Sequence, residues 1–355
     1  MPSSRGLLVY LVLLAAAGIV AGEAYRLVNW GRDVLGCTLS RDAGTFLAYC
    51  TSDQYGDFEH GAYYFGLEPE AVDNLRKAKV LLLGNSRSQF AFSTDEVKRY
   101  FNEHSLPFYL MGFGYGEGSD FARTLIKKYN LKPKVLVIVA DPFFKSWLSP
   151  PASAIADNLN PFWMRIRARW EYFTKKFFNM LAPKICDLRV TLCLSNLPAI
   201  YRSSKDGSWI WRNLFAPPEH GQIPINSARV PIFGPPATTD LEIARQLFEV
   251  AGVQRDCVVL TVVPNSVIDA GHYAVEIGRL LGVRVVLPEL DGLMTIDSAH
   301  LTWTSAQRWS GSLLREIDAL VSTCVSDDLE KAQGDVVRAA AVSESRLRSG
   351  GVAPE

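Results

Sequence analysis

The feature that most constrains the fold is a short apolar run at residues 80–83 (VLLL), which ends abruptly at Gly84-Asn85-Ser86. Consecutive apolar residues without alternation are typical of a strand buried on both faces, as in parallel sheets covered by helices. Ligands of such sheets bind at the carboxyl ends of the strands. The run therefore predicts an α/β fold and places Ser86 where a binding site is expected.

Further strand-like and helix-like patterns alternate along the chain. The predicted strands are 107–111, 135–140, 257–263 and 283–287, and the predicted helices include 119–129, 266–281 and one that begins near Thr302. Two capping boxes, Ser93 with Glu96 and Thr239 with Glu242, predict further helix starts. This spacing predicts a three-layer α/β/α fold around a central parallel five-stranded sheet, with right-handed crossovers.

Three segments interrupt or flank this alternation. Residues 25–70 form a juxtamembrane lead-in with little periodicity, and residues 149–236 form an insertion rich in prolines and aromatic residues. Residues 325–355 turn polar and small, so we expect a loosely ordered tail. The main domain is predicted to span 71–324, including the insertion.

The amino-terminal segment predicts contact with a membrane. Residues 6–22 are seventeen uncharged residues, close to the lower limit for a spanning helix. We expect residues 1–24 to be a retained single-pass anchor in the inner (cytoplasmic) membrane, with the main domain exported to the periplasm or cell exterior. The alternative is a cleavable signal peptide, because Gly22-Glu23-Ala24 offers a small-x-small site.

The charge and cysteine content limit the binding partners and cofactors that we expect. Thirty-seven basic residues balance thirty-seven acidic ones, so no global field recruits nucleic acid. Two cysteine pairs, Cys37 with Cys50 and Cys186 with Cys193, can close short loops in an oxidising compartment, whereas Cys257 reads as a buried thiol. No metal-ligand spacing is present, and we expect no metal and no cofactor.

A base for Ser86 can be sought among only five histidines. A serine hydroxyl becomes a nucleophile when a base takes its proton and an orienting group holds the base. His300 follows the last predicted strand in Asp297-Ser298-Ala299-His300-Leu301. A carboxylate three residues before the imidazole can bind Nδ1 and leave Nε2 free to face Ser86.

Acyl transfer also needs hydrogen-bond donors for the oxyanion. The backbone amide of Ser86 is one candidate, and the amide of Gly112 or Gly114 after the second strand is another. Glycine lets a substrate approach the main chain closely.

Together these motifs resemble the ordered blocks of the SGNH (GDSL-like) hydrolase superfamily. The resemblance covers Gly84-Asn85-Ser86-Arg87-Ser88, the glycines after the second strand, and Asp297-Ser298-Ala299-His300-Leu301. It implies a flavodoxin-like fold in which Ser86 is the nucleophile, His300 the base, Asp297 its orienter, and Gly114, preferred over Gly112, the second oxyanion donor. Asn85 and Arg87 beside the nucleophile are candidate substrate contacts.

One block departs from the family pattern. Members usually carry an Asn after the third strand as an oxyanion donor, whereas this chain has Asp141 there. An ionised Asp141 would repel an oxyanion, so it is a candidate substrate contact instead, and Asn265 after the fourth strand is a candidate replacement donor. If Asn265 does not supply a donor, the oxyanion hole has two donors. The resemblance implies that membrane-anchored relatives, which modify cell-envelope polysaccharides, often diverge in this block.

Several of these residues also have a purely structural interpretation. Gly84-Asn85-Ser86 can be a strand-to-helix turn in which Ser86 only caps the helix, and Asp141 can cap the turn that follows it. The other four histidines are assigned surface or structural roles, with His104 and His272 in helical stretches and His60 and His220 in irregular ones.

The insertion carries aromatic and basic residues together. Between Pro161 and Lys184 there are six basic residues against one acid, interleaved with Trp163, Trp170 and several phenylalanines. The segment is either a cap that packs its aromatics on the sheet or a basic helix that lies on an anionic membrane. A further suggestion is a sugar-binding cleft lined by Tyr201, Trp209, Trp211 and Arg212.

The sequence thus predicts a serine-dependent esterase or O-acyltransferase that acts through an acyl-enzyme on ester-linked acyl groups of a cell-envelope polysaccharide. A lipid or small-ester hydrolase is the second enzymatic possibility. The other class is a non-catalytic component of an envelope-assembly complex, which would use the same fold to bind polysaccharide or assembly proteins.

Overall fold

The structure is a computed structural model that describes residues 44–50, 57–156, 199–211, 222–225, 230–231 and 234–349, together with 13–14, 16–22 and seven residues between 162 and 173. The chain forms two compact units. The first contains Met1–Glu68 and Ala154–Arg202, and the second contains Pro69–Ser153 and Ser203–Glu355.

The second unit is built on a five-stranded parallel sheet. Its strands lie in the order β11 (Arg284–Val285), β9 (Val258–Thr261), β4 (Val135–Val139), β2 (Val80–Asn85) and β3 (Phe108–Phe113). Ranked along the chain, this order is 2-1-3-4-5, which is the flavodoxin-like arrangement. The predicted five-stranded parallel sheet is confirmed.

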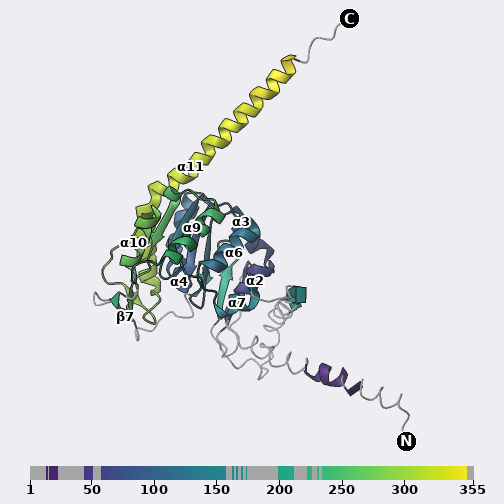
Figure 1. Ribbon diagram of the computed structural model, residues 1–355, viewed down its shortest axis with the longest axis vertical. Helices are drawn as coiled ribbons and strands as arrows, with labels where there is room; N and C mark the ends of the chain where they lie inside the picture. Colours follow the sequence, from purple (N-terminus) through teal and green to yellow (C-terminus); the bar gives the residue numbers. More distant parts are fainter. Residues whose placement is uncertain are drawn as a thin grey trace. The chain divides into compact units, whose positions relative to one another are not determined.

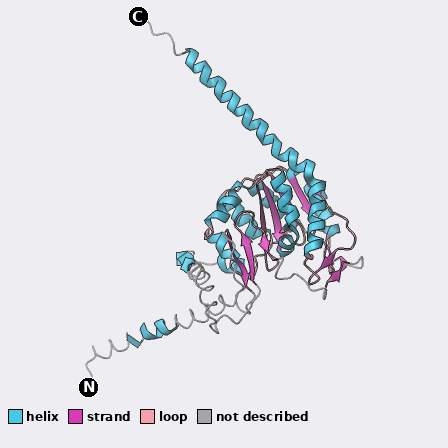
Figure 2. Ribbon diagram, turned by 180° about the vertical axis from the view of Figure 1, so that it is seen from behind, coloured by secondary structure: helices cyan, strands magenta, loops and turns pink. Residues whose placement is uncertain are grey.

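Helices cover both faces of this sheet, as Figures 1 and 2 show. Strand side chains alternate between the faces. Val80, Leu82 and Val137 join the core formed with α4 (Ser86–Phe92), α5 (Asp95–Glu103) and α11 (Trp303–Ser349). The other helices of the unit are α3 (Pro69–Lys77), α6 (Ser119–Tyr129), α9 (Thr238–Ala251) and α10 (Gly271–Leu281), of which α9 packs against both α6 and α10. Helix α7 (Pro150–Ala156) begins in this unit and ends in the first. The result is a three-layer α/β/α architecture.

Short elements complete the second unit. They are β6 (Trp209–Ile210), β7 (Ile223–Pro224), β8 (Val230–Pro231), β10 (Ile268–Asp269), β12 (Met294–Thr295) and the 3₁₀ turn η2 (Arg255–Cys257). Strands β12 and β7 pair antiparallel, and β10 and β8 pair parallel. Several of them fall inside the predicted insertion, which therefore contains regular structure.

Three helix starts differ from the sequence prediction because other side chains bind the first free amides. Thr94, not Ser93, caps α5 through Val97 N. Helix α9 begins at Thr238, with the amide of Ala237 donating to Asp240. Helix α10 begins at Gly271, not Ser266, because Asn265 Oδ1 accepts from the amides of Val267 and Ile268 and holds them in a turn.

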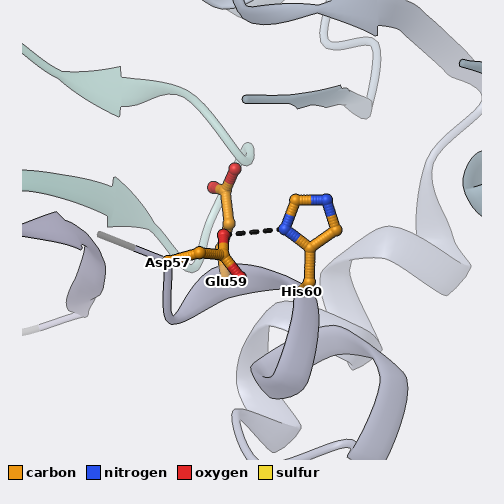
Figure 3. Close-up of side chains that lie close together, drawn as sticks. All are labelled: Asp57, Glu59 and His60. Carbon is orange, nitrogen blue, oxygen red and sulfur yellow. Dashed lines mark hydrogen bonds and ion pairs between the residues drawn. The ribbon is translucent and has the colours of Figure 1, made fainter. Parts of the chain in front are cut away.

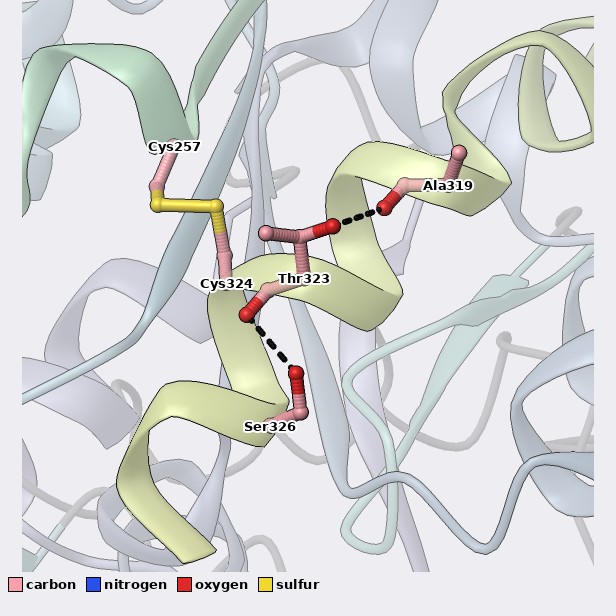
Figure 4. The surroundings of a disulfide bond; sticks show 5 residues. All are labelled: Cys257, Ala319, Thr323, Cys324 and Ser326. Atoms are coloured by element: carbon pink, nitrogen blue, oxygen red, sulfur yellow. Dashed lines mark hydrogen bonds between the residues drawn. A yellow bond between two sulfur atoms is a disulfide. The ribbon is translucent and has the colours of Figure 1, made fainter. Parts of the chain in front are cut away.

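A disulfide joins Cys257 to Cys324 and ties η2, directly before β9, to α11 (Figure 4). The prediction that Cys257 is a free buried thiol is therefore wrong. Its partner lies 67 residues away, and spacing along the chain does not reveal such a pair. The chain-entropy model gives about 4 kcal/mol of stabilisation for a loop of this length. The pairings predicted for Cys37 with Cys50 and Cys186 with Cys193 lie outside the side chains that the structure describes.

Helix α11 continues to Ser349, beyond the point where a loosely ordered tail was expected. Its sequence has no proline between residues 303 and 349 and is rich in helix formers such as alanine, glutamate and arginine. Near the disulfide, the hydroxyls of Thr323 and Ser326 donate to carbonyls of the preceding turn (Figure 4).

The first unit joins the lead-in to part of the insertion. Strand β1 (Thr45–Cys50) pairs with β5 (Ala199–Ser203), and helix α2 (Glu59–Phe65) follows β1. Residues 13–14 and 16–22 of the predicted anchor are described, and these residues are helical. Among the described residues, no helix is long and apolar enough to cross a membrane.

Candidate functional site

Ser86 is the first residue of α4 and directly follows β2. β2 lies between β3 and β4. The strand that follows β2 in sequence is added on one side of it, and the later strands are added on the other side. The carboxyl edge beside such a switch point is where doubly wound folds bind ligands. The fold therefore puts Ser86 at the position that a ligand would approach.

Ser86, His300 and Asp297 form one hydrogen-bonded series. Ser86 Oγ lies 2.9 Å from His300 Nε2 across a separation of 214 residues. His300 Nδ1 lies 2.7 Å from Asp297 Oδ2. Both distances are within the range for direct proton transfer along a hydrogen bond. The arrangement has the order and geometry of a serine, its base and the base's orienter.

A tight turn holds His300 in this position. Asp297 Oδ1 accepts from the amides of Ala299 and His300, at 3.1 and 2.9 Å. Ser298 has φ of 71°, a left-handed conformation that bends the chain between the two partners. The Ser298 carbonyl accepts from the amide and hydroxyl of Ser266, which fixes the turn to the loop after β9.

The Asp297 carboxylate stays ionised. Partial burial by itself would raise its pKa, but the hydrogen bond and charge of His300, with the two backbone amides, lower the pKa to about 2. Asp297 can therefore stabilise a positive charge that forms on His300 during proton transfer.

Asn85 and Arg87 bracket Ser86 and both bind Asp141. Asn85 Oδ1 caps α4 through Arg87 N at 2.9 Å, and Asn85 Nδ2 donates to the Asp141 carbonyl at 3.1 Å. Arg87 Nη1 forms an ion pair with Asp141 Oδ2. Asn85 is buried, and both ends of its amide bind the protein's own groups. These contacts show that Asn85, Arg87 and Asp141 hold the turn that carries Ser86.

Asp141 is fully buried, and burial raises the pKa of its carboxyl group while the Arg87 charge opposes that rise. Its Oδ1 has no hydrogen-bond partner among the described residues. The Arg87 guanidinium compensates the charge that the sequence analysis expected to repel an oxyanion. Repulsion from Asp141 is therefore weaker than its carboxylate alone would cause.

The candidate oxyanion donors separate into two groups. Gly112 pairs in register with Gly84, and a methyl group on Gly112 would lie 2.9 Å from the Asn85 carbonyl oxygen, so this glycine lets α4 pack on β3. Gly114 stands one residue beyond Phe113, the register partner of Asn85, and is thus level with Ser86. As the first helical residue, Ser86 has an amide with no partner inside α4. The geometry favours Gly114 and Ser86 over Gly112.

Asn265 offers a side-chain amide at the same edge of the sheet. Strands β4 and β9 are neighbours, and Asn265 follows β9 as Asp141 follows β4. Its Oδ1 holds two backbone amides, whereas its buried Nδ2 has no partner among the described residues. Asn265 therefore keeps a free donor.

Aromatic side chains border His300. The Phe90 ring lies 4.4 Å from the His300 ring and 4.6 Å from Trp211, centroid to centroid. Phe90 was missed because a helix after Ser86 was considered only as an alternative and its faces were not examined. In that helix, Phe90 shares a face with Ser86, four residues earlier. Trp209 and Trp211 are buried, so they do not line an open sugar cleft, and Arg212 lies outside the described residues.

The first unit contains a second carboxylate–histidine cluster. Asp57, Glu59 and His60 place their ligand atoms within 4.8 Å of one another (Figure 3). His60 Nδ1 lies 2.7 Å from Asp57 Oδ1, and Arg202 Nη1 lies 2.7 Å from Glu59 Oε2. The Arg202 guanidinium also lies over the Tyr63 ring. The cluster thus consists of two internal pairs, one of them with a cation.

No protein-family model matches the chain, and no curated protein and no solved structure matches it either.

Proposed function

We propose that the chain is a serine-dependent esterase or O-acyltransferase with an SGNH-like site, which forms an acyl-enzyme on Ser86. The observation that carries the proposal is the series from Ser86 through His300 to Asp297, at 2.9 and 2.7 Å. The flavodoxin-like sheet supports it, because Ser86 lies at the switch point.

The reaction follows from these positions. Ser86 Oγ attacks the ester carbonyl carbon while His300 Nε2 takes the hydroxyl proton, and the carbonyl electron pair moves onto oxygen. The donors proposed for this oxyanion are the amides of Ser86 and Gly114, with Asn265 Nδ2. Collapse of the intermediate breaks the bond to the alcohol, which leaves with the proton from His300. Water or a sugar hydroxyl then attacks the acyl group by the reverse sequence.

The proposed substrate is an acylated cell-envelope polysaccharide, and the proposed location is an exported domain held by an amino-terminal membrane anchor. The Cys257–Cys324 disulfide supports export, because such bonds persist in oxidising compartments. Transfer and hydrolysis differ only in whether a sugar hydroxyl or water resolves the acyl-enzyme.

An activated acetyl ester with a chromogenic leaving group tests the proposal. We expect rapid release of one leaving group per folded chain, followed by slower turnover that a sugar acceptor accelerates. Ser86→Ala removes the rapid phase, while Ser312→Ala, which changes a serine of α11, retains it. If the folded wild-type chain shows no rapid phase, a non-catalytic binding component becomes the better account.

A further inference from the structure

The exposed apolar side chains of the described residues are concentrated in two short stretches. One lies within the predicted anchor, and the other lies between residues 162 and 173. The second stretch contains Phe162, Trp163, Ile166, Trp170 and Phe173, which are between 43% and 66% exposed. Side chains of this size and exposure in one short segment mark an interaction surface rather than a core.

The spacing of these residues places them on one side of a helix. All seven described residues in this stretch are helical, and Arg165 and Arg169 are exposed with the five apolar residues. At about 100° per residue, the apolar side chains fall within an arc of about 100°, and the two arginines border one side of it. We call these seven residues the aromatic–basic face.

We propose that the aromatic–basic face binds an anionic lipid surface. A stripe of tryptophan, phenylalanine and isoleucine with flanking arginines is the pattern of a helix that lies in the headgroup region of a bilayer. Tryptophan rings favour that interface, and arginines can extend their guanidinium groups to lipid phosphates. The surrounding sequence has an excess of positive charge, with one acidic residue between Pro161 and Lys184.

Charge decides between an anionic membrane and a neutral apolar partner as the occupant of this face. A neutral apolar partner would give no role to Arg165 and Arg169, whereas anionic headgroups pair with them. The inference is independent of the chemistry proposed for Ser86.

The test uses the full chain with two kinds of vesicle, both containing brominated acyl chains that quench tryptophan fluorescence on contact. One kind is pure phosphatidylcholine, and the other also contains anionic phosphatidylglycerol. We expect stronger quenching with the anionic vesicles, and this excess should disappear in Trp163→Phe/Trp170→Phe. Trp147→Phe is the matched control, because Trp147 is 50% exposed but lies in the second unit, and it should leave the excess unchanged.

Charge removal gives a second, independent readout. Arg165→Gln/Arg169→Gln should weaken the preference for anionic vesicles by about fivefold per arginine, and added salt should do the same. The membrane proposal is overturned if quenching is equal in both kinds of vesicle, or if Trp163→Phe/Trp170→Phe leaves the anionic excess intact. The latter result would assign lipid contact to another segment, such as the predicted anchor.

Discussion

Two carboxylate–histidine pairs in this protein have nearly the same local geometry but different surroundings. Asp297 with His300 and Asp57 with His60 are each three residues apart, and in each pair the carboxylate lies 2.7 Å from Nδ1. His300 is partly exposed and its Nε2 meets Ser86, whereas the His60 side chain is fully buried beside the Glu59–Arg202 ion pair. The carboxylate–histidine pair alone therefore does not identify the proposed catalytic site. The contact of His300 Nε2 with Ser86 is what distinguishes it.

The largest effect should come from removing the proposed base. His300→Gln should slow the reaction of Ser86 with a fluorophosphonate probe by about 10³-fold, because general-base catalysis contributes about 10²–10⁴. His60→Gln should leave the labelling rate per folded chain unchanged. Equal slowing in both variants would remove the distinction between the two histidines.

The next effect should appear in the stability of the buried cluster. Glu59→Ala leaves the buried Arg202 charge without its carboxylate, and this should cost about 3–5 kcal/mol of unfolding free energy. Glu276→Ala is the control, because its pair with Arg279 is on the surface and should contribute little to stability. Denaturant titration measures both. A cost for Glu59→Ala no greater than for Glu276→Ala would mean that the buried pair does not hold the first unit together.

A smaller effect is expected from the orienting carboxylate. Asp297→Asn should slow labelling of Ser86 by about 10²-fold, at the lower end of the range for general-base catalysis and less than the loss of the base itself. Because the pKa of Asp297 is about 2, the carboxylate is ionised at neutral pH, so the rates of the two proteins should be compared there. The stability that Asp297 contributes is fully present above its unfolded pKa and is lost as the pH falls towards 2. Asp57→Asn should not slow labelling.

The smallest effect concerns Asp141, which binds Asn85 and Arg87 in the turn that carries Ser86. Its raised pKa means that the folded state binds its proton more tightly than the unfolded state does. The stability of the wild type relative to Asp141→Asn should therefore be greatest in acid and decline as the pH rises through the folded-state pKa. Unfolding titrations of both proteins at acid and neutral pH measure this. A wild type that gains relative stability as the pH rises would show that the Arg87 pair outweighs burial.

The sequence correctly predicted those strands and helices that depend on residues close together in the chain. Residues 80–83 formed the expected buried strand, and the helix predicted at 119–129 is α6. The loops after β2 and β9 leave the same edge of the parallel sheet, and Ser266 of the β9 loop binds the turn that carries His300, which brings His300 to Ser86.

The features that were missed depend on contacts distant in sequence or on polar side chains that redirect the backbone. Cys257 pairs with Cys324, and Arg87 pairs with Asp141, across intervals that no spacing rule covers. His60 was placed in an irregular stretch but lies in α2, paired with Asp57. Asn265 delayed the start of α10 by binding two amides that a helix could otherwise have used.

The central claim is that Ser86 is a nucleophile activated by His300, and locating the covalent adduct of a fluorophosphonate tests it most directly. Peptide mass spectrometry of the labelled, folded chain should find the adduct on Ser86, with none after prior unfolding and none in Ser86→Ala. An adduct on another residue, or labelling of Ser86→Ala at the wild-type rate, would contradict the account.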